Sequence, residues 1–345
     1  MMASVGGLIF TAGAAAAAVL LLAVTCDATA PPVPPLLKTW WHNRSEAQVH
    51  APVAPNAVRR SPFFAVGVSV ASPGGVDTPP PSRAFVYLSI PRSGAPKRGY
   101  TEADGAEYAT SARLTMSWAS FLYAADVWVY ITHLGPQYHR VDLPRIFQTR
   151  PRRLAAELGT WRRVNNDTIA VRVPHRPGGF RFSVEFSDEN VVTYNDGTGC
   201  CNLTDRPGPG HLPVHTQPRN ALMIFAEPMI TDPDERVRLD PEFDPAVNGA
   251  GVGNRSITIA TPGDVRGLLR NVSTQVIYFG PGVYWMTGAF SARLRDPVRW
   301  VHLAPGAYLK GALEFGGTQQ SEYKVTGFGV LSGEQVYSQN PRGRG

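Results

Sequence analysis

Aromatic side chains are the residues of this sequence best suited to binding a ligand, because their flat faces stack well on the apolar face of a sugar ring. Trp40 and Trp41 are adjacent near the N-terminus, whereas Tyr284, Trp285 and Tyr308 lie near the C-terminal end. We treat these five residues as candidates for carbohydrate stacking. A structural alternative stays open for each group: the two tryptophans can fix the N-terminal segment in a buried corner, and the later aromatics can stack inside a core.

Pairs of carboxylates supply the acid and the base of many hydrolytic sites, and this chain offers few candidates. Glu314 and Glu334 fall in successive repeats and could share one face, but a solvated surface carboxylate is the more ordinary interpretation. The acidic stretch at residues 232–244 contains the oxygen ligands that calcium prefers, although its spacing fits no known calcium loop and its prolines indicate a linker. We therefore assign no catalytic residue, no metal ligand and no cofactor to this chain.

The cysteines point to no metal site either. Cys200 and Cys201 are adjacent, and the sequence after residue 30 has no second pair to complete four ligands. A strained vicinal disulfide and two free thiols both remain compatible with this spacing.

The composition is that of a folded protein rich in β-structure. Of the 345 residues 43% are apolar, 10% aromatic and only 17% charged, which excludes a mainly disordered chain. The 34 glycines and 31 prolines disfavour long helices and are typical of short strands joined by turns. The net charge is +6, but the arginines are mostly dispersed and lack an interleaved aromatic platform, so we expect no nucleic-acid partner.

Residues 1–30 predict a cleaved secretory signal peptide. An almost uninterrupted apolar run from Leu8 to Val24 precedes Ala28-Thr29-Ala30, whose small residues suit a signal peptidase. An uncleaved membrane anchor is the alternative, because the segment before the run has no lysine or arginine. We expect a secreted, extracellular protein with no stable membrane association after signal removal. Sequons for N-glycosylation agree with secretion and lie at Asn43, Asn166, Asn202, Asn254 and Asn271.

Alternating apolar residues predict an antiparallel β-sandwich in the first part of the mature chain. In Phe180-Arg181-Phe182-Ser183-Val184-Glu185-Phe186 every second residue is apolar, as expected of a strand with one wet face and one buried face. Similar runs recur between about residues 60 and 190, with Pro and Gly turns between them. We assign residues 31–218 to this domain, including an irregular lead-in and a linker rich in Gly, Pro, Asp and Thr.

Spaced echoes predict a different architecture for residues 219–345. Gly280-Pro281-Gly282-Val283-Tyr284 is echoed 24 residues later by Ala304-Pro305-Gly306-Ala307-Tyr308, and a weaker copy follows. Repeats of this length, built of short strands and glycine turns, are typical of a solenoid, here the first coils of a right-handed parallel β-helix. We expect stacked rows that pair Val283 with Ala307 and Trp285 with Leu309. So few coils leave an open apolar end, so we expect the front part of a longer protein.

These echoes and other blocks, in order along the chain, resemble the dextranases of glycoside hydrolase family 49. The blocks are Thr39 to Asn43, Phe85 to Arg92, Met116 to Trp118, Val171 to Pro174, Arg181 to Phe186, Asn220 to Ala226, Tyr278 to Met286 and Leu303 to Ala312. The resemblance implies an all-β fold in which a sandwich packs on a right-handed parallel β-helix. It also implies secretion and endo-hydrolysis of α-1,6-glucosidic linkages in dextran, with isopullulanase as a relative of different linkage preference.

The resemblance further implies an inverting mechanism, in which one aspartate is the general acid and another helps to activate water. It places the catalytic aspartates beyond residue 345, so we expect this chain to be inactive alone. The implied partner is a dextran-like α-glucan, and we expect a monomer. A second hypothesis stays open, namely a non-catalytic carbohydrate-binding or cell-wall-associated β protein. Continuation of the reading frame into coils with paired aspartates would favour the hydrolase, and a true stop codon would favour the binding protein.

Overall fold

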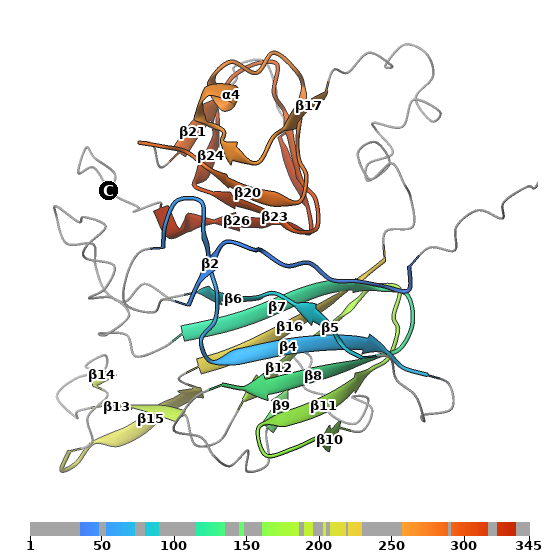
Figure 1. Cartoon of the computed structure of the whole chain (residues 1–345). Coiled ribbons are helices and arrows are strands. Elements are labelled where there is room, and N and C mark those ends of the chain that lie inside the picture. The colour runs from blue at the N-terminus through green and yellow to red at the C-terminus, as the bar shows by residue number, and fades with distance from the viewer. Residues whose placement is uncertain are drawn as a thin grey trace, which may run out of the picture. The chain divides into compact units, whose positions relative to one another are not determined.

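Strands dominate the computed structural model of this chain (Figure 1). The structure describes residues 35–47, 53–72, 80–89, 115–134, 145–147, 161–185, 190–195, 203–204, 208–218, 220–229, 257–288, 291–316 and 323–335. The predicted signal peptide therefore lies outside the described residues. Within those ranges, no helix combines the length and the apolar character needed to cross a membrane.

The first domain is a sandwich of two β-sheets. One sheet has the strand order β1-β7-β16-β12-β9, with β6 also paired to β7, and the other has the order β10-β11-β8-β4-β5. Every pair in these sheets is antiparallel except β7 with β16, which is parallel, so the predicted antiparallel arrangement holds with one exception. The first sheet contains β1 (Leu37–Lys38), β6 (Val86–Ser89), β7 (Thr115–Tyr123), β9 (Arg145–Phe147), β12 (Phe180–Glu185) and β16 (Asn220–Pro228). The second contains β4 (Phe64–Val70), β5 (Ser82–Ala84), β8 (Val127–His133), β10 (Trp161–Arg163) and β11 (Thr168–Val173).

The core of the sandwich follows from the alternation of apolar residues. In β8, Val127, Val129 and Ile131 are completely buried, whereas the residues between them are partly exposed. They share one hydrophobic cluster with buried residues of the opposite sheet, among them Phe121 and Phe182. Each such side chain stabilises the fold by roughly 1.5–3 kcal/mol when it leaves water, so period-two patterning fixes which face of each strand turns inward.

The sandwich extends past the boundary that we predicted after residue 218. Strand β16 lies between β7 and β12 in the first sheet, and its residues alternate between buried and partly buried. Leu222 and Ile224 belong to the sandwich core, so the pairing and the packing both assign this strand to the first domain.

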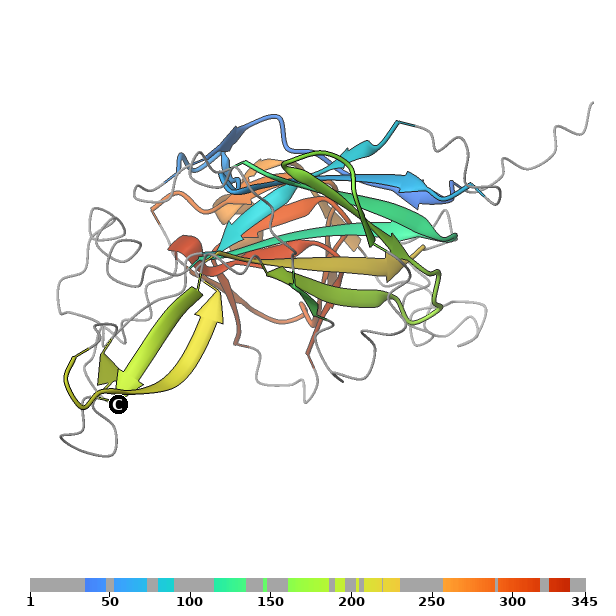
Figure 2. The ribbon, with the colours of Figure 1, turned by 90° about the horizontal axis from the view of Figure 1, so that it is seen from below.

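Two smaller sheets accompany the sandwich. In the three-stranded sheet, yellow-green in Figure 2, β13 (Asn190–Asn195) pairs antiparallel with both β14 (Leu203–Thr204) and β15 (Leu212–Pro218). The other sheet is a short parallel pair, β2 (Ser45–Glu46) with β3 (Val58–Arg59). This pair fixes the lead-in segment between β1 and β4, which later supplies residues to the candidate site.

The second domain consists of parallel coils, orange to red in Figure 1. Strands that follow one another along the chain belong to different sheets, and each pairs in parallel with its equivalent in the next coil. The first of the three coil sheets contains β17 (Ile257–Ala260), β19 (Val276–Phe279), β22 (Trp300–Leu303) and β25 (Lys324–Gly327). The second contains β18 (Gly263–Asp264), β20 (Gly282–Trp285), β23 (Ala307–Lys310) and β26 (Val330–Ser332), and the third β21 (Ser291–Leu294) and β24 (Ala312–Phe315). One short helix, α4 (Arg266–Arg270), and the 3-10 turn η4 (Gly333–Gln335) complete the described elements of the coils.

This pairing is that of a parallel β-helix, as the echoes predicted, and its right-handed sense stays a prediction. We predicted that Val283 would pair with Ala307 and Trp285 with Leu309, but the observed register differs by one residue. Gly282 pairs with Ala307 and Val283 with Tyr308, because the turn before β23 holds one residue more than the turn before β20. A shift of one residue exchanges the faces of a strand, so Tyr284 points into the coil core and Val283 points outward.

Candidate functional site

The segment after β1 holds its aromatic residues against the sandwich. The backbone oxygen of Trp40 accepts a hydrogen bond from the Phe85 nitrogen at 3.1 Å. The Trp40 indole nitrogen donates to the Tyr87 hydroxyl at 3.0 Å, and Nε2 of His42 lies 2.8 Å from the same oxygen. Burial lowers the pKa of His42 to about 4, which favours the neutral ring, and the tautomer of that ring sets whether Nε2 or the Tyr87 hydroxyl is the donor.

An aromatic cluster joins the sandwich to the coils, and we call it the interface cluster. Its buried members are Val58, Phe85, Tyr87 and Tyr308, with Trp40, Trp41, Trp118, Val283 and Val330 packed around them. Tyr87 stacks on Trp118 with ring centroids 4.2 Å apart and on Tyr308 with centroids 5.6 Å apart. Because Tyr308 comes from β23 and Tyr87 from β6, this stack fixes the first coils against the outer face of the first sheet.

Beside the interface cluster lies a pocket of about 370 Å³, which we call the tryptophan pocket. Three of the five predicted stacking residues, Trp40, Trp41 and Trp285, line it together. The remaining lining residues are His42, Asn43, Arg44, Asn56, Pro262, Gly263, Pro281, Gly282, Val283 and Gly306. The lead-in segment thus forms one wall and the coils the other, and both walls carry indole rings.

The wall made by the coils consists of their stacked corner turns, which are the Pro-Gly echoes of the sequence. The Gly282 nitrogen donates to the Gly306 oxygen at 3.0 Å and so joins two successive turns. Gly306 has a φ of +83°, and a Cβ there would lie 3.3 Å from the Cβ of Trp40. Glycine is therefore needed twice over, for the left-handed backbone and for the close approach of Trp40 to the turn.

Two residues at β5 and directly before β6 hold the Trp41 ring in place. The guanidinium carbon of Arg83 lies 3.9 Å from the Trp41 ring centroid, and the Phe85 ring meets Trp41 edge-on with centroids 5.3 Å apart. A cation over an indole face is worth roughly 0.5–1 kcal/mol at an exposed site. The contact occupies one face of Trp41 and keeps the indole in place.

Polar residues of the tryptophan pocket were not predicted from the sequence. Asn43 and Arg44 are exposed and Asn56 is half-buried, all on the lead-in wall. Proximity to Trp41 along the chain was the available signal for the first two. The sequence held no such signal for Asn56, because the parallel pairing of β2 with β3 brings this residue to the pocket.

Two predicted stacking residues do not reach the pocket, because both are buried. Tyr284 is 0% exposed inside the coil core, and its hydroxyl donates to the Gly280 oxygen at 2.9 Å. Burial raises the pKa of Tyr284 to about 12. Tyr308 is 4% exposed in the interface cluster, where burial raises its pKa well above the ordinary value. The structure therefore assigns core packing to these two tyrosines in place of sugar stacking.

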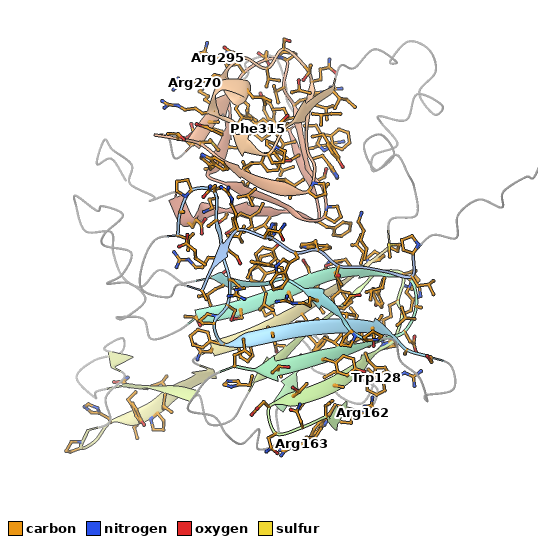
Figure 3. All side chains as sticks on the ribbon, viewed as in Figure 1. Trp128, Arg162, Arg163, Arg270, Arg295 and Phe315 are labelled. Atoms are coloured by element: carbon orange, nitrogen blue, oxygen red, sulfur yellow. The ribbon has the colours of Figure 1, made fainter. Side chains whose placement is uncertain are left out.

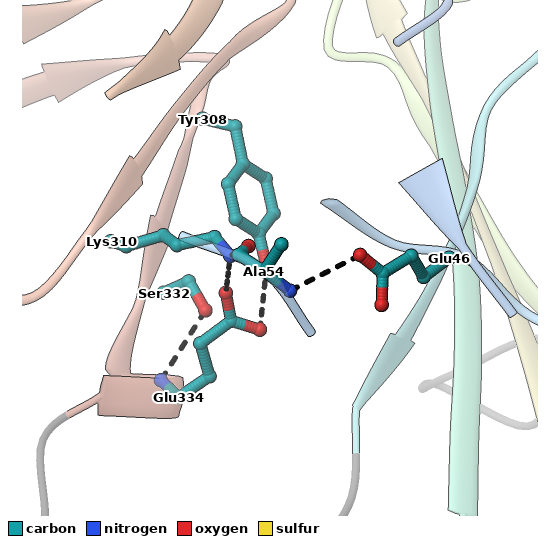
Figure 4. Close-up of polar contacts among 6 residues, drawn as sticks. All are labelled: Glu46, Ala54, Tyr308, Lys310, Ser332 and Glu334. Atoms are coloured by element: carbon teal, nitrogen blue, oxygen red, sulfur yellow. Dashed lines mark hydrogen bonds and ion pairs between the residues drawn. The ribbon is translucent and has the colours of Figure 1, made fainter. Parts of the chain in front are cut away.

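The buried Lys310 ammonium forms an ion pair within the coils and also a hydrogen bond to the lead-in segment (Figure 4). Lys310 is 1% exposed, and its Nζ lies 2.7 Å from Oε1 of Glu334 and donates to the Ala54 oxygen at 3.0 Å. The Tyr308 hydroxyl is 3.5 Å from the other carboxylate oxygen of Glu334, and the Ala54 nitrogen donates to Glu46 at 3.2 Å. The ammonium therefore has partners from both parts of the chain, as a buried charge requires.

The two carboxylates weighed as an acid and base pair lie on different sheets. Glu334 follows β26 and is engaged with Lys310, whereas Glu314 lies in β24 and is in register with Arg293 of β21. Glu314 is exposed, so its environment is that of a solvated surface carboxylate. The described coils therefore do not assemble these two groups into one site.

The described residues include no group of three or more His, Cys, Asp or Glu side chains that could hold a metal ion. The acidic stretch at 232–244 and the Cys200-Cys201 pair lie outside those residues. Among the sequons, Asn43, Asn166 and Asn271 are exposed, while Asn202 and Asn254 lie outside the described ranges.

One further aromatic surface was missed by the sequence reading. Trp128 of β8 is partly exposed, and the guanidinium carbon of Arg162 in β10 lies 4.7 Å from its ring centroid; Figure 3 labels both. The tryptophan pocket is the better candidate for stacking on a ligand, because three tryptophans line it together and Trp128 is not among its lining residues.

Fold and site together define an all-β protein in which a sandwich and parallel coils meet at an aromatic pocket. Residues 28–229 match the family model described as the glycosyl hydrolase family 49 N-terminal Ig-like domain. The chain belongs to glycosyl hydrolase family 49.

Known proteins of the family resemble most of the chain. A dextranase of Arthrobacter sp. (strain CB-8) is 42% identical over 330 residues, which cover 90% of this chain and 48% of the relative. Isopullulanase of Aspergillus niger is 34% identical over 303 residues, with 87% and 44% covered. The solved structure of Dex49A from Penicillium minioluteum has a TM-score of 0.65 and 28% identity, and covers 87% of this chain and 50% of that one. The chain spans about half the length of the curated relatives it matches.

Proposed function

We propose that this chain forms part of a secreted glycoside hydrolase of the dextranase type, which cleaves α-1,6-glucosidic linkages within dextran with inversion of configuration. The observation that carries the proposal is the 42% identity to a dextranase across 90% of the chain. The sandwich joined to parallel coils agrees with it, because the similar structure of Dex49A has a TM-score of 0.65 over 87% of the chain.

The chemistry of inversion sets a geometric requirement. Two carboxyl groups must lie ~6.5–9.5 Å apart, so that one protonates the leaving oxygen while the other activates a water. Neighbouring strands of stacked coils are ~4.7–4.9 Å apart, so carboxylates on nearby coils suit this spacing. Among the described acids, Glu334 is held by Lys310, and Asp264 accepts hydrogen bonds from the Arg266 and Thr287 nitrogens at 3.0 and 3.3 Å.

In this proposal the catalytic aspartates lie beyond residue 345, as the resemblance to the family implies. The described residues then serve as scaffold, in which the sandwich and lead-in segment hold the first coils through the interface cluster and the Lys310 hydrogen bond. Substrate chemistry is that of a neutral polyhydroxyl chain, for which no cofactor is required.

The test is release of reducing sugar from dextran and, in parallel, from pullulan. We expect no release above blank from residues 31–345 and release from dextran by a product extended to the length of the relatives. Proton NMR of the first products should show the β-anomer, which is the outcome of inversion at an α-linkage. Turnover by residues 31–345 alone would contradict the placement of the aspartates, and an extended product inert on dextran would contradict the dextranase assignment in favour of a non-catalytic binding protein.

Secretion is a separate part of the proposal. N-terminal sequencing of the secreted protein should begin at Pro31, directly after Ala30. Retention of residues 1–30 in a membrane fraction would instead support the uncleaved anchor.

A further inference from the structure

We propose that the tryptophan pocket is a binding site for an α-glucan chain, with sugar rings stacked on Trp285 and the lead-in tryptophans. The class of sugar rests on the proposed function, whereas the site itself rests on the pocket. Its volume of about 370 Å³ falls within the ~300–1,000 Å³ range of small-ligand pockets.

The indole rings come from segments far apart in the chain, and those of Trp40 and Trp41 are held in place before any ligand binds. Trp285 is the last residue of β20 and lies on the outer face, because the neighbouring Tyr284 points into the coil core. Trp40 is held through its indole nitrogen by Tyr87, and Trp41 lies under the guanidinium of Arg83. Side chains that are already immobile lose little conformational entropy on binding, which favours affinity for a weakly interacting sugar.

The polar lining fits a neutral, hydroxyl-rich ligand. The amides of Asn43 and Asn56 both donate and accept hydrogen bonds, as sugar hydroxyls do, and Arg44 adds a fork of donors. In the part of the chain that the structure describes, no carboxylate lines the pocket. The lining can therefore hold a sugar chain but supplies no pair of carboxylates for cleaving it.

A second source of the same chemistry lies at the rim of the pocket. Asn43 belongs to the sequon Asn43-Arg44-Ser45, so a glycan attached there would place pyranose rings beside the same indoles. We commit to a free α-glucan chain as the occupant, and the test separates the two sources. The variant S45A serves this purpose, because it removes the sequon while keeping every residue that lines the pocket.

The experiment is titration of residues 31–345 with isomaltohexaose, followed by isothermal calorimetry and intrinsic tryptophan fluorescence. We expect saturable binding that W285A weakens about tenfold or more, as the loss of a stacking contact requires. The matched control is W161A, which removes a tryptophan of β10 that is 39% exposed and lies outside the pocket. W161A should bind as the wild type does, and equal melting temperatures of the variants establish that the fold is retained.

Several results would overturn the inference. Absence of saturable binding would do so, as would W285A affinity equal to wild type or equal binding of cellohexaose, whose linkages are β. Binding by S45A but not by a glycosylated wild type would assign the pocket to the protein's own glycan. Dextran hydrolysis is measured separately. A chain that binds the sugar but does not hydrolyse dextran supports this inference alone. An extended protein that hydrolyses dextran, with a sugar affinity that W285A leaves unchanged, supports the proposed function alone.

Discussion

Acidification should destabilise the coils through His302, which is 2% exposed in β22. Its ring stacks on Tyr278 with centroids 5.5 Å apart, and Nδ1 lies 3.0 Å from the hydroxyl oxygen of Thr326. That hydroxyl already accepts from the Trp300 indole nitrogen. Nε2 is buried with no hydrogen-bond partner among the described residues, so a doubly protonated ring would leave an N–H unsatisfied.

The size of the effect follows from the pKa of this histidine. Burial lowers the pKa of His302 from 6.5 to about 4, so the unfolded chain takes up the proton first as the pH falls. The free energy of unfolding should therefore decrease below pH 6.5 and level off below about pH 4. Between neutral pH and pH 5 the contribution of His302 to this decrease is roughly 2 kcal/mol.

Guanidinium unfolding, followed by tryptophan fluorescence at pH 7.5 and pH 5.0, measures this directly. The variant H302Q has no ionisable ring, so its loss of stability between the two pH values should be smaller than that of the wild type by roughly 2 kcal/mol. The control H175Q replaces an exposed histidine and should keep the wild-type difference. An H302Q protein whose pH dependence equals that of the wild type would refute the burial argument.

Two further substitutions test the junction by the same unfolding measurement. K310M should lower the free energy of unfolding by roughly 3–5 kcal/mol, because Glu334 loses its buried partner, and K310M/E334Q should recover part of that loss; a loss below about 1 kcal/mol would contradict the role of the ion pair. G306A should cost roughly 1–3 kcal/mol, since its backbone is left-handed and Trp40 lies against the turn. The control G267A has open space around the new methyl group in α4 and should be neutral or stabilising.

Local patterns in the sequence predicted most of the fold. Alternation in 127–131 and 180–186 identified sandwich strands, because burial on one face of a strand repeats every second residue. The Pro-Gly echoes likewise identified corners of successive coils. Both signals are short-range, and both concern features that the chain repeats.

The site depended on contacts that no local pattern records. Asn56 and Trp285 line one pocket although they lie far apart in the sequence, and only the docking of the coils brings them together. Sugar stacking by the residues that line the pocket therefore stays a prediction. Three of the five aromatic residues line the pocket, whereas Tyr284 is buried in the coil core and Tyr308 in the interface cluster.

The turn before β23 is one residue longer than the turn before β20, and this difference sets which face each tyrosine occupies. The echo aligned Pro281 with Pro305, yet Gly282 is already in its strand while Gly306 still belongs to the turn. The register moves by one, which brings Tyr308 beside Val283 on the outer face of the coils and sends Tyr284 inward.

The first sheet of the sandwich carries aromatic residues on the face away from its own core, where the coils cover them. Tyr87 and Phe85 pack on outward-facing residues of β20, β23 and β26, so each domain covers apolar surface that the other would leave in water. The Lys310 ammonium lies at the edge of this contact and takes a carbonyl from the lead-in segment as a partner. Apolar burial and a satisfied charge thus fix the two walls of the tryptophan pocket relative to each other, which is the condition for rigid indoles on opposite walls to meet one sugar chain.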